Sequence, residues 1–598
     1  MKIPNKKIIV LVVFAVILAI GIFLRAYNFS DWLHFELDQS RDAKLIDLAI
    51  QNGPENLPLL GPKAAGSFLR LGPIFYYFNY ISALVFGNTP EGMAGIIMIF
   101  GILAIPAFYF LARRYFSVWI ALALALIFST SLFLAMYSRF SWNPNALPFF
   151  TIMLAYSLLR AADKDEKNSG HWLMGAAFFL AVATQLHFLA FVSMPVIALV
   201  FLLIKRPKVK WQYWLGAAAI ILVMNLPIII NEIKTGGANS RQFMEVATGK
   251  SEKSADKTLI EKVFKNYTEN SSAYFLILAS KNTDLPTLEK NPESDIRCEK
   301  LCREGKFPGL AAILIFSLGI FFALKNFIFE KNAGKKDFLM MVIIWFVVSF
   351  GLFTPLAFNI SPRFWLIISA LPFIFLGLSF EFFGKILPKK IWIILIAAVT
   401  IAFFWSNLSE TYGRFQSLEK ASTEVVDSLS DRILKERYRV TLEQQYAVVD
   451  YLESFYKKNG YTVYLNSSNF YSRSLRFHLD RRGIPRDGFG IAASSSQIYK
   501  NGNYFLVYPT SSNLQRQLDK YVPIYEEINR QQFGTLIVIQ LVPKESYITD
   551  IQQAMEVKKV SKNAPGVPKR YIWGEIFGND NNEIDVDEIS ADEIEEDL

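Results

Sequence analysis

Long apolar runs, separated by short polar segments, dominate the first 410 residues of the chain. Each run holds roughly 17–22 residues, the length that an α-helix needs to cross the hydrocarbon core of a bilayer. The runs lie near residues 8–24, 92–112, 118–137, 145–159, 172–187, 189–204, 212–230, 308–324, 338–357, 364–380 and 391–407. This pattern predicts a polytopic α-helical membrane protein with about 11 spans.

One further apolar segment, residues 72–87, differs from these runs. It opens with Gly72-Pro73, carries three tyrosines and is short for a span. Counting it as a span would also move every later basic loop to the opposite side of the membrane. We therefore expect an interfacial helix on the outer face, where Tyr is favoured.

The basic residues predict the orientation of the chain. Cytoplasmic loops of membrane proteins are enriched in Lys and Arg. Lys2, Lys6 and Lys7 precede the first run, and the basic clusters of later loops fall on that same side. The N-terminus is therefore predicted to be cytoplasmic, in a multi-pass protein of the cytoplasmic (inner) membrane, and an odd number of spans places the C-terminal part outside.

Beyond residue 410 the sequence changes to that of a small soluble α/β domain. Residues 441–458 have the periodicity of an amphipathic helix, and residues 461–465, 504–508 and 536–542 predict strands. From residue 580 onward there are ten acidic residues and no basic one, which is typical of a disordered tail. The predicted domains are a transmembrane domain (1–407), an extracytoplasmic α/β domain (410–565) and an acidic tail (566–598).

Composition agrees with a membrane protein and argues against a nucleic-acid partner. Hydrophobic residues make up 52% of the 598 positions and charged residues only 19%, which is rare in soluble chains. The net charge of +9 comes largely from the loops between spans. Cys298 and Cys302 fall in a predicted outer loop, where they form either a local disulfide or two free thiols.

Polar residues that differ from this basic background gather on the predicted outer side. An acidic cluster, residues 36–42, follows the first span directly. The candidates for chemistry at this face are Glu36, Asp38, Asp42, Lys63, Arg70, Arg139, Asn143, Asn145, His187 and Arg363. Charged groups at membrane depth cost about 2–3 kcal/mol each unless they face partners or water. Such a set predicts a cavity that binds a phosphate-bearing lipid beside a reactive carboxylate.

The order and sidedness of these motifs resemble a known family over roughly residues 1–405. The chain is similar to the multi-span, lipid-carrier-dependent glycosyltransferases with the GT-C fold, the group of bacterial protein O-mannosyltransferases and aminoarabinose transferases. The resemblance rests on the acids after the first span, Gly61-Pro62, residues 71–77, residues 139–145, Gln185-Leu186-His187 and Pro362-Arg363-Phe364. It implies sugar transfer from a polyprenyl-phosphate carrier to a protein, lipid or glycan acceptor on the outer face.

The resemblance also implies roles for the candidates. Asp38 takes the place of the family's catalytic acid, alone or through a divalent cation, the one cofactor expected. The family has an adjacent Asp-Glu pair, whereas Gln39 follows Asp38 here, so Glu36 and Asp42 are candidates for the second carboxylate. Arg363 would bind the carrier phosphate, with Arg70 or Lys63 assisting. The expected substrate-binding residues are Arg139, Asn143, Asn145 and His187.

Two other functions fit the same pattern. A transporter or flippase for a lipid-linked or amphiphilic substrate would also need a polar cavity between spans, but such proteins often show internal repeats and polar residues at mid-depth. Neither feature is evident here. A catalytically inactive scaffold that presents the outer domain is the third alternative. Each candidate residue also has a purely structural explanation, such as a solvated loop for the acids or an interfacial position for Arg363.

Overall fold

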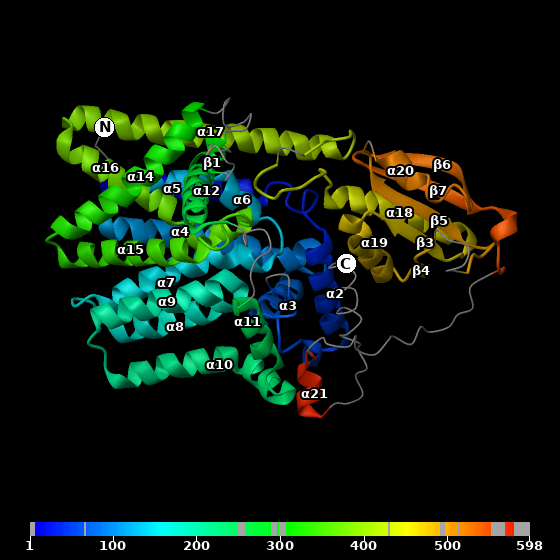
Figure 1. Ribbon diagram of the computed structural model, residues 1–598, viewed down its shortest axis with the longest axis horizontal. Helices are drawn as coiled ribbons and strands as arrows, with labels where there is room; N and C mark the ends of the chain where they lie inside the picture. The colour runs from blue at the N-terminus through cyan, green and yellow to red at the C-terminus, as the bar shows by residue number, and fades with distance from the viewer. Residues whose placement is uncertain are drawn as a thin grey trace.

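The structure, a computed structural model, describes most of the chain. It covers residues 6–578 except 65–66, 249–256, 282, 284, 289–295, 298–305, 429–430, 491–496, 512 and 552–568. Cys298, Cys302 and the acidic residues from Asp580 onward lie outside the described residues. A helical membrane domain and a smaller domain built on a β-sheet are evident (Figure 1).

The membrane domain is a bundle of long helices with several short elements at one end, where the β-sheet domain docks (Figure 1). Its helices are α1 (Lys6–Ala26), α2 (Leu37–Asn52), α3 (Ile74–Phe86), α4 (Pro90–Tyr115), α5 (Val118–Thr130), α6 (Leu132–Tyr137), α7 (Leu147–Ala162), α8 (Ser169–Leu186), α9 (Phe188–Lys205), α10 (Trp211–Thr235), α11 (Ala238–Thr248), α12 (Leu259–Ala279), α14 (Lys306–Phe329), α15 (Ala333–Phe353), α16 (Leu371–Ile386) and α17 (Lys389–Ala421). The 3-10 helices η1 (Pro54–Asn56), η2 (Asn143–Ala146) and η4 (Pro362–Ile368) and the two-residue strands β1 (Thr287–Leu288) and β2 (Ile296–Arg297) complete it.

The structure gives fewer candidate spans than the 11 predicted. Within the described residues, eight helices are long and apolar enough to cross a membrane, or nine if the bent pair η4–α16 counts as one span. The predicted span 118–137 breaks at Ser131, which caps α6 and donates a hydrogen bond to Ile277. The 13 residues of α5 extend only about 20 Å, short of a core of about 30 Å. The run 172–187 forms the 18-residue helix α8, which is not in this set.

Helix α3 covers the predicted interfacial segment and is also too short to span. Its 13 residues bury one side, including Phe75 and Tyr76, against the bundle. Leu84 and Val85, on its other side, are 61% and 66% exposed. The segment therefore has the two-faced character expected at a membrane interface.

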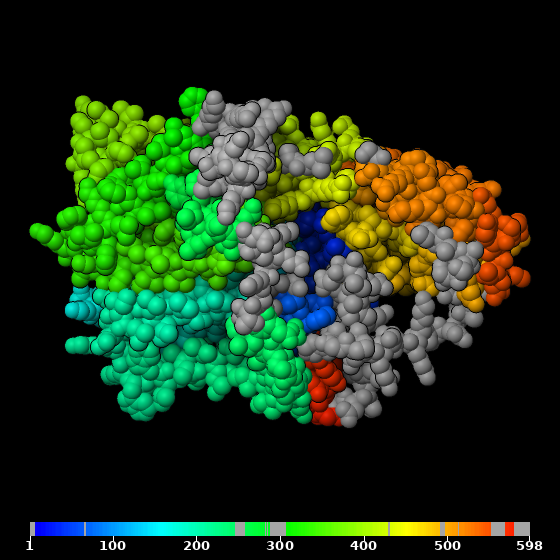
Figure 2. Space-filling model, viewed as in Figure 1, coloured from blue at the N-terminus to red at the C-terminus, as the bar shows by residue number. Residues whose placement is uncertain are grey.

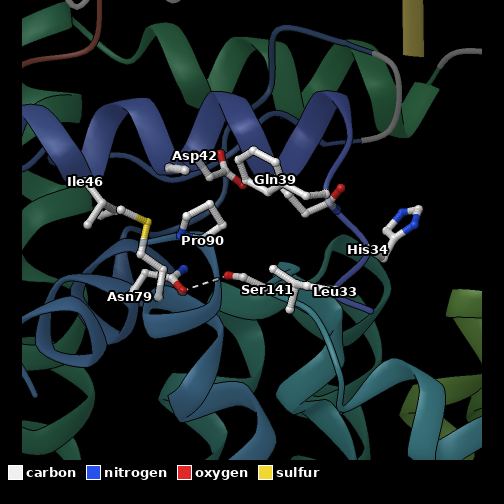
Figure 3. A pocket seen from close by; sticks show the side chains of 11 residues that line it. Leu33, His34, Gln39, Asp42, Ile46, Asn79, Pro90 and Ser141 are labelled. Atoms are coloured by element: carbon white, nitrogen blue, oxygen red, sulfur yellow. Dashed lines mark hydrogen bonds between the residues drawn. The ribbon is translucent and has the colours of Figure 1, made fainter. Parts of the chain in front are cut away.

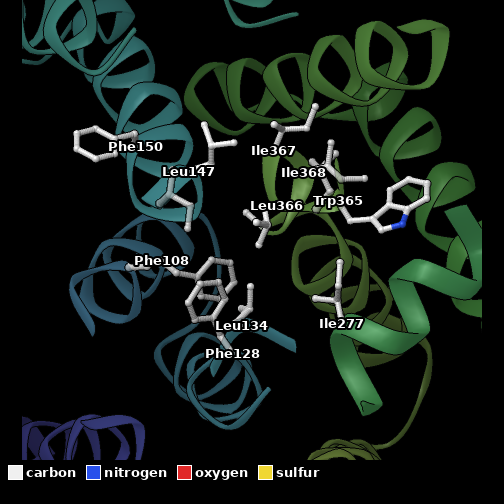
Figure 4. Packing of buried hydrophobic residues seen from close by; sticks show 14 of the residues in the cluster. Phe108, Phe128, Leu134, Leu147, Phe150, Ile277, Trp365, Leu366, Ile367 and Ile368 are labelled. Atoms are coloured by element: carbon white, nitrogen blue, oxygen red, sulfur yellow. The ribbon is translucent and has the colours of Figure 1, made fainter. Parts of the chain in front are cut away.

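The break between η4 and α16 lies inside the hydrophobic core. The two helices meet at an angle of 53°. Trp365 and the three residues after it are buried (Figure 4). Leu366 lies on the side of Leu134 and Phe128, whereas Trp365 points the other way and packs against Phe353 of α15, with ring centroids 4.9 Å apart. This packing anchors the 3-10 helix, which therefore holds Arg363 at the end of the bundle where the second domain docks.

The C-terminal domain is a mixed five-stranded sheet with two main helices. The sheet order is β4-β3-β5-β7-β6, in which β3 is parallel to β4 and β5, while β7 is antiparallel to β5 and β6. Its elements are α18 (Leu442–Asn459), β3 (Val463–Ser467), α19 (Asn469–Arg481), β4 (Arg486–Asp487), β5 (Asn503–Pro509), α20 (Leu514–Leu518), β6 (Tyr525–Phe533), β7 (Leu536–Pro543) and η5 (Glu545–Tyr547). The predicted helix and three strands are confirmed as α18, β3, β5 and β7, whereas β6 and α19 were not predicted.

The two domains are joined by α17 and by direct contacts. Helix α17 is 33 residues long and continues past the predicted domain end at residue 407. At the other contact, α19 packs against α2. Gln445 of α18 donates a hydrogen bond of 2.8 Å to the carbonyl of Phe35, directly before α2. The C-terminal domain therefore lies against the segment that carries the acidic cluster.

A short segment near the C-terminus is also ordered. Residues 569–578 include helix α21 (Trp573–Phe577), which packs on η1. The amide of Leu59 donates to the carbonyl of Tyr571, and Trp573 Nε1 donates to the hydroxyl of Tyr77 at 2.9 Å. Residues 569–578, which belong to the predicted tail 566–598, thus include a helix, and their aromatic side chains find partners on the membrane domain.

The lack of a side chain at Gly61 allows the two sides of the loop before α3 to approach closely, and this gives a test of the packing. A Cβ at Gly61 would lie 2.2 Å from the carbonyl oxygen of Gly72, a backbone atom that cannot swing away. We expect Gly61→Ala to destabilise the protein by about 1–3 kcal/mol, a typical cost of overpacking. Thermal unfolding in detergent measures this, with Gly413→Ala on α17 as the control.

Gly413 has no described heavy atom within 4 Å of the position that its Cβ would take. Since Ala is favoured over Gly inside a helix, Gly413→Ala should leave the melting temperature unchanged or raise it. Equal melting temperatures for Gly61→Ala and the unaltered protein would contradict the close approach.

Candidate functional site

The acidic cluster forms the first turn of helix α2. Glu36 is the residue before the helix, and its amide donates to Gln39 Oε1 at 3.1 Å in a capping box. Asp38 lies in the first turn, where the positive end of the helix dipole favours a negative charge. Because α2 turns once every 3.6 residues, Asp38, Arg41 and Asp42 lie on neighbouring positions of one face.

Asp38 is the most accessible of the three candidate acids. Its Oδ1 accepts a hydrogen bond of 3.0 Å from Arg41 Nη1, and its Oδ2 accepts one of 3.0 Å from Trp142 Nε1. Its side chain is nevertheless 37% exposed. A carboxylate that is oriented by two donors and still reachable is suited to accept a proton from a bound hydroxyl.

Trp142 connects Asp38 to Arg363, although the two are distant in sequence. The Arg363 guanidinium lies over the Trp142 ring, 4.6 Å from its centroid. The negative charge of Asp38 acts on the same guanidinium. The structure thus brings together the predicted catalytic acid and the predicted phosphate-binding Arg, with one indole between them.

His187 lies on the far side of Arg363. Its ring packs against Phe364 with centroids 5.4 Å apart, and its Nδ1 accepts a hydrogen bond from the amide of Leu189. Burial, and then the positive charge of Arg363, lower the pKa of His187 to about 3. His187 is therefore neutral and caps α9 beside the candidate site.

Lys63 and Arg70 pair across a β-bridge in the loop before α3. Arg70 is buried, and its amide donates to Asn239 Oδ1 of α11 at 2.7 Å. Leu69 and Leu71 from this loop pack with Phe188, the residue after His187. The loop therefore adjoins the His187 side of the site, and the contacts described here do not include Asp38.

The contacts of Arg139 are structural. Its guanidinium donates to four carbonyls at the end of α1, those of Leu24, Arg25, Tyr27 and Asn28, at 2.8–3.3 Å. Unpaired carbonyls at a helix C-terminus attract a cation in this way. Since the guanidinium is buried in this cap, the structure does not support the prediction that Arg139 binds substrate.

Asn143 and Asn145 also bind the backbone. Asn143 Nδ2 donates to the carbonyl of Leu186 at 2.7 Å, which ties η2 to the end of α8 beside His187. Asn145 Nδ2 donates to the carbonyl of Phe140 at 3.0 Å. Both side chains are buried, so they position Trp142 and His187 rather than reach into an open cavity.

Glu36 belongs to a buried group of charges shared with the C-terminal domain. Tyr471 of α19 donates to Glu36 Oε1 at 3.3 Å, and His34 Nδ1 lies 3.0 Å from Glu436 Oε1. Burial raises the pKa of Glu36. Burial opposes protonation of His34, but Glu36 and Glu436 outweigh it and raise the pKa of His34. Glu36 is thus held between Tyr471 and His34.

Asp42 is buried under α2, next to a cavity of about 270 Å³ that we call the inner cavity. Its Oδ1 accepts hydrogen bonds from Arg41 at 2.9 Å and from Tyr76 at 3.1 Å. Its Oδ2 is buried with no hydrogen-bond partner among the described residues. Gln39 and Asp42 face this cavity from α2, opposite the Ser141–Asn79 hydrogen bond (Figure 3).

The three carboxylates do not form a metal site. Glu36 faces Tyr471, Asp38 faces Trp142 and Asp42 faces Tyr76. Within the described ranges, no group of three or more His, Cys, Asp or Glu side chains is placed to hold a metal ion. The described residues therefore offer no ready-made ligand set for the expected divalent cation.

Comparisons with known proteins agree with this architecture. The chain matches the crystal structure of ArnT from Cupriavidus metallidurans bound to undecaprenyl phosphate, with a TM-score of 0.50 and 11% identity, over 91% of this chain and 99% of that one. The apo structure of the same protein matches over the same shares at 11% identity with a TM-score of 0.40. Residues 71–230 match the model of the family described as dolichyl-phosphate-mannose-protein mannosyltransferase. No curated protein matches the chain significantly.

The helical bundle and the sheet domain docked on it have a fold similar to that of ArnT. Over residues 71–230 the chain resembles the dolichyl-phosphate-mannose-protein mannosyltransferase family. The resemblance inferred from sequence is therefore confirmed. The matched range contains His187 but neither Asp38 nor Arg363, whose roles rest on geometry.

Trp142, His34 and Tyr471 were not among the predicted site residues. Trp142 lies inside the 139–145 motif, directly before Asn143, and this position was the one available signal. For Tyr471 no signal exists, because it is 435 residues from Glu36 in the chain. Contacts at that separation depend on how the two domains dock.

The burial of Asp42 predicts a pH dependence of stability. Burial, only partly offset by Arg41, raises the pKa of Asp42 from 3.8 to about 6. The folded protein then binds the proton more tightly than the unfolded chain, so the stability contributed by this group falls as pH rises from about 4 to 6. Asn does not titrate in this range. The free energy of unfolding of Asp42→Asn, minus that of the unaltered protein, should therefore be up to about 3 kcal/mol larger above pH 6 than at pH 4 or below.

Thermal melts of the variant and the unaltered protein between pH 4 and pH 8 measure this difference. It should grow with pH and level off above pH 6. A difference that is constant over the whole range would show that Asp42 is not titrating in this way.

Proposed function

We propose that the protein transfers a sugar from a polyprenyl-phosphate carrier to a hydroxyl acceptor, a protein, lipid or glycan, at the outer face of the cytoplasmic membrane. The observation that carries the proposal is the arrangement of Asp38, Trp142 and Arg363. One accessible carboxylate and one cation are held on either side of the same indole. The likeness to ArnT, bound to undecaprenyl phosphate in its structure, supports this class of donor.

In the proposed reaction Asp38 accepts the proton of the acceptor hydroxyl. The acceptor oxygen forms a bond to the anomeric carbon, and the bond from that carbon to the phosphate oxygen breaks with inversion. The departing lipid phosphate gains negative charge, which the Arg363 guanidinium stabilises. Lys63 and Arg70 support this end from the loop beside His187, and Glu36 and Asp42 hold the start of α2.

The membrane-facing side of α3 suits entry of the lipid carrier. Ile81, Leu84, Val85 and Phe86 are each at least half exposed on this short helix. An apolar helix face at the interface allows a lipid tail to remain in the bilayer while its head group reaches the polar site. The C-terminal domain, residues 410–565, then covers the site from the outer side, in the orientation that the basic loops predict.

Asp38→Asn tests the role of the carboxylate. The amide keeps the size and the hydrogen-bonding oxygen but cannot take a proton, so we expect transfer from a polyprenyl-phosphate sugar to fall about 10²–10⁴-fold. The assay measures kcat on purified protein. Asp47→Asn is the matched control, because Asp47 lies on the same helix and bonds to Gln51 and Asn88 away from Trp142.

The control should retain near-normal turnover. Undiminished transfer by Asp38→Asn would exclude Asp38 as the base, and an equal loss in the Asp47→Asn control would indicate that α2 itself is disturbed.

Arg363→Gln tests the phosphate end of the site. Loss of the cation removes stabilisation of the leaving phosphate, and we expect kcat/KM for the lipid donor to fall about 10²–10³-fold. Arg363→Lys should recover part of it, because the charge returns without the planar fork. The exposed Arg516 of α20 provides the control Arg516→Gln. Donor kinetics that are unaffected by Arg363→Gln would place the phosphate elsewhere.

A further inference from the structure

Trp142 is held in place by contacts that involve neither of the two charged groups of the site. The residue before it, Ser141, donates a hydrogen bond of 2.7 Å to Asn79 of α3. The residue after it, Asn143, donates one of 2.7 Å to the carbonyl of Leu186 at the end of α8. The position of the indole is therefore set by α3 and α8.

The indole uses its edge and its face for two different charged partners. Its Nε1 donates a hydrogen bond of 3.0 Å to Asp38 Oδ2, whereas the Arg363 guanidinium lies over the ring, 4.6 Å from the centroid. The face of an indole is negative and attracts a cation, while its N–H points outwards in the plane of the ring. The two contacts therefore place the carboxylate and the cation in different directions from the ring.

Asp38 and Arg363 do not bind one another, although the charge of Asp38 acts on the guanidinium. In the part of the chain that the structure describes, no carboxylate or other acceptor is paired with this guanidinium. Its contacts are with the rings of Trp142 and Phe364, 4.6 and 5.7 Å from their centroids. The N–H groups of Arg363 are therefore available to an incoming anion.

Two other buried arginines show the usual outcome. Arg414 pairs directly with Asp431 and Glu436, and Arg139 donates to four carbonyls. Arginine and carboxylate form strong paired hydrogen bonds when their geometry allows it. An arginine that stays unpaired close to an acid therefore indicates that something keeps the two apart. At Arg363 the indole occupies that position.

Direct pairing would occupy both reactive ends of the site. The carboxylate of Asp38 would fill the guanidinium fork in place of a phosphate, and a carboxylate bound in this way is a poorer proton acceptor. Asp38 instead keeps a side chain that is 37% exposed. It belongs to the first part of the chain, whose dark-blue surface lies in a hollow between the membrane domain and the C-terminal domain (Figure 2).

We propose that Trp142 is a positioning residue, whose indole orients the base and keeps it apart from the phosphate-binding cation. Asp38 is thereby left to accept a proton, and Arg363 is left to bind the lipid phosphate. The reactive roles of these two side chains rest on the proposed function, whereas their separation by the ring does not.

Thermal unfolding of the full-length protein in detergent tests the separation without ligand or activity. Asp38→Asn, Arg363→Gln and the double variant form a double-mutant cycle. With Trp142 present, the shifts in melting temperature should be nearly additive. In the Trp142→Leu protein the two charges can meet, so the double variant should lose clearly less than the sum of the single losses. A deviation from additivity that is no larger in the Trp142→Leu protein overturns the proposal.

Binding of a short-chain polyprenyl phosphate, with the neutral polyprenol as the control, tests whether Arg363 is kept available. Trp142→Leu should weaken binding of the phosphate about tenfold or more, because Arg363 is then engaged by Asp38. Adding Asp38→Asn to this variant should restore most of the affinity. The recovery must exceed any gain that Asp38→Asn produces with Trp142 present; without this excess the proposal is wrong.

Trp142→Phe tests how the base is oriented, and it decides the proposal if Trp142→Leu does not fold. The variant keeps a ring for Arg363 but loses the N–H. We expect kcat to fall about 10–100-fold with an unchanged donor KM. The acidic limb of the kcat–pH profile should move to higher pH, because the charged carboxylate loses a donor.

The matched control is Trp392→Phe at the start of α17, which loses the hydrogen bond of 2.8 Å from Nε1 to the carbonyl of Phe380. It should change neither kcat nor the pH profile. An unchanged kcat in Trp142→Phe, or a loss of kcat without a shift of the acidic limb, contradicts the positioning role.

Failure of the proposed function is distinguishable from failure of this proposal. It would appear in the unaltered protein, as absence of transfer and of polyprenyl phosphate binding. The thermal double-mutant cycle would then decide by itself whether the indole separates the two charges.

Discussion

A buried network of opposite charges between the two domains is the constraint on which the candidate site depends. Arg414 of α17 and Arg439 both bind Asp431 and Glu436, and the four side chains are each less than a tenth exposed. Glu436 in turn lies 3.0 Å from His34, shortly before α2. Removing one partner from such a network costs about 3–5 kcal/mol, because the other charge remains buried. The network therefore fixes where α2 begins, and with it the position of Asp38.

Burial, more than sequence position, separates the three acids of α2. Glu36 is tied to Tyr471 and His34, and Asp42 is enclosed beneath the helix beside Tyr76. Asp38 is also hydrogen-bonded, but it is 37% exposed and faces the Arg363 side of the site. A group that must exchange a proton with a substrate needs this combination of orientation and access. The same helix turn thus supplies two anchors and one reactive candidate.

The elements that were predicted correctly carry a strong local pattern. The apolar runs of the bundle became helices, and β5 and β7 were recognised from continuous β-branched and aromatic residues. Strand β6 was missed because eight of its nine residues are at least partly exposed, so its sequence lacks the alternation of a half-buried strand, and pairing with β7 alone defines it. The described residues hold fewer candidate spans than predicted, in part because hydropathy does not register the break at Ser131, which depends on a partner in α12.

The sequence by itself determined that the chain is a polytopic membrane protein, since the length of apolar runs and the basic loops are local properties of the sequence. It also gave the resemblance to the GT-C glycosyltransferases. It also identified Asp38 and Arg363 as candidates. Only the tertiary structure decided which candidates lie together, because Trp142 lies between those two side chains and Arg139 is enclosed by the end of α1. The pocket lined by Ser40 of α2 and Phe477 of α19 likewise required docking of α19 on α2, since its lining residues are far apart in the chain until the domains meet.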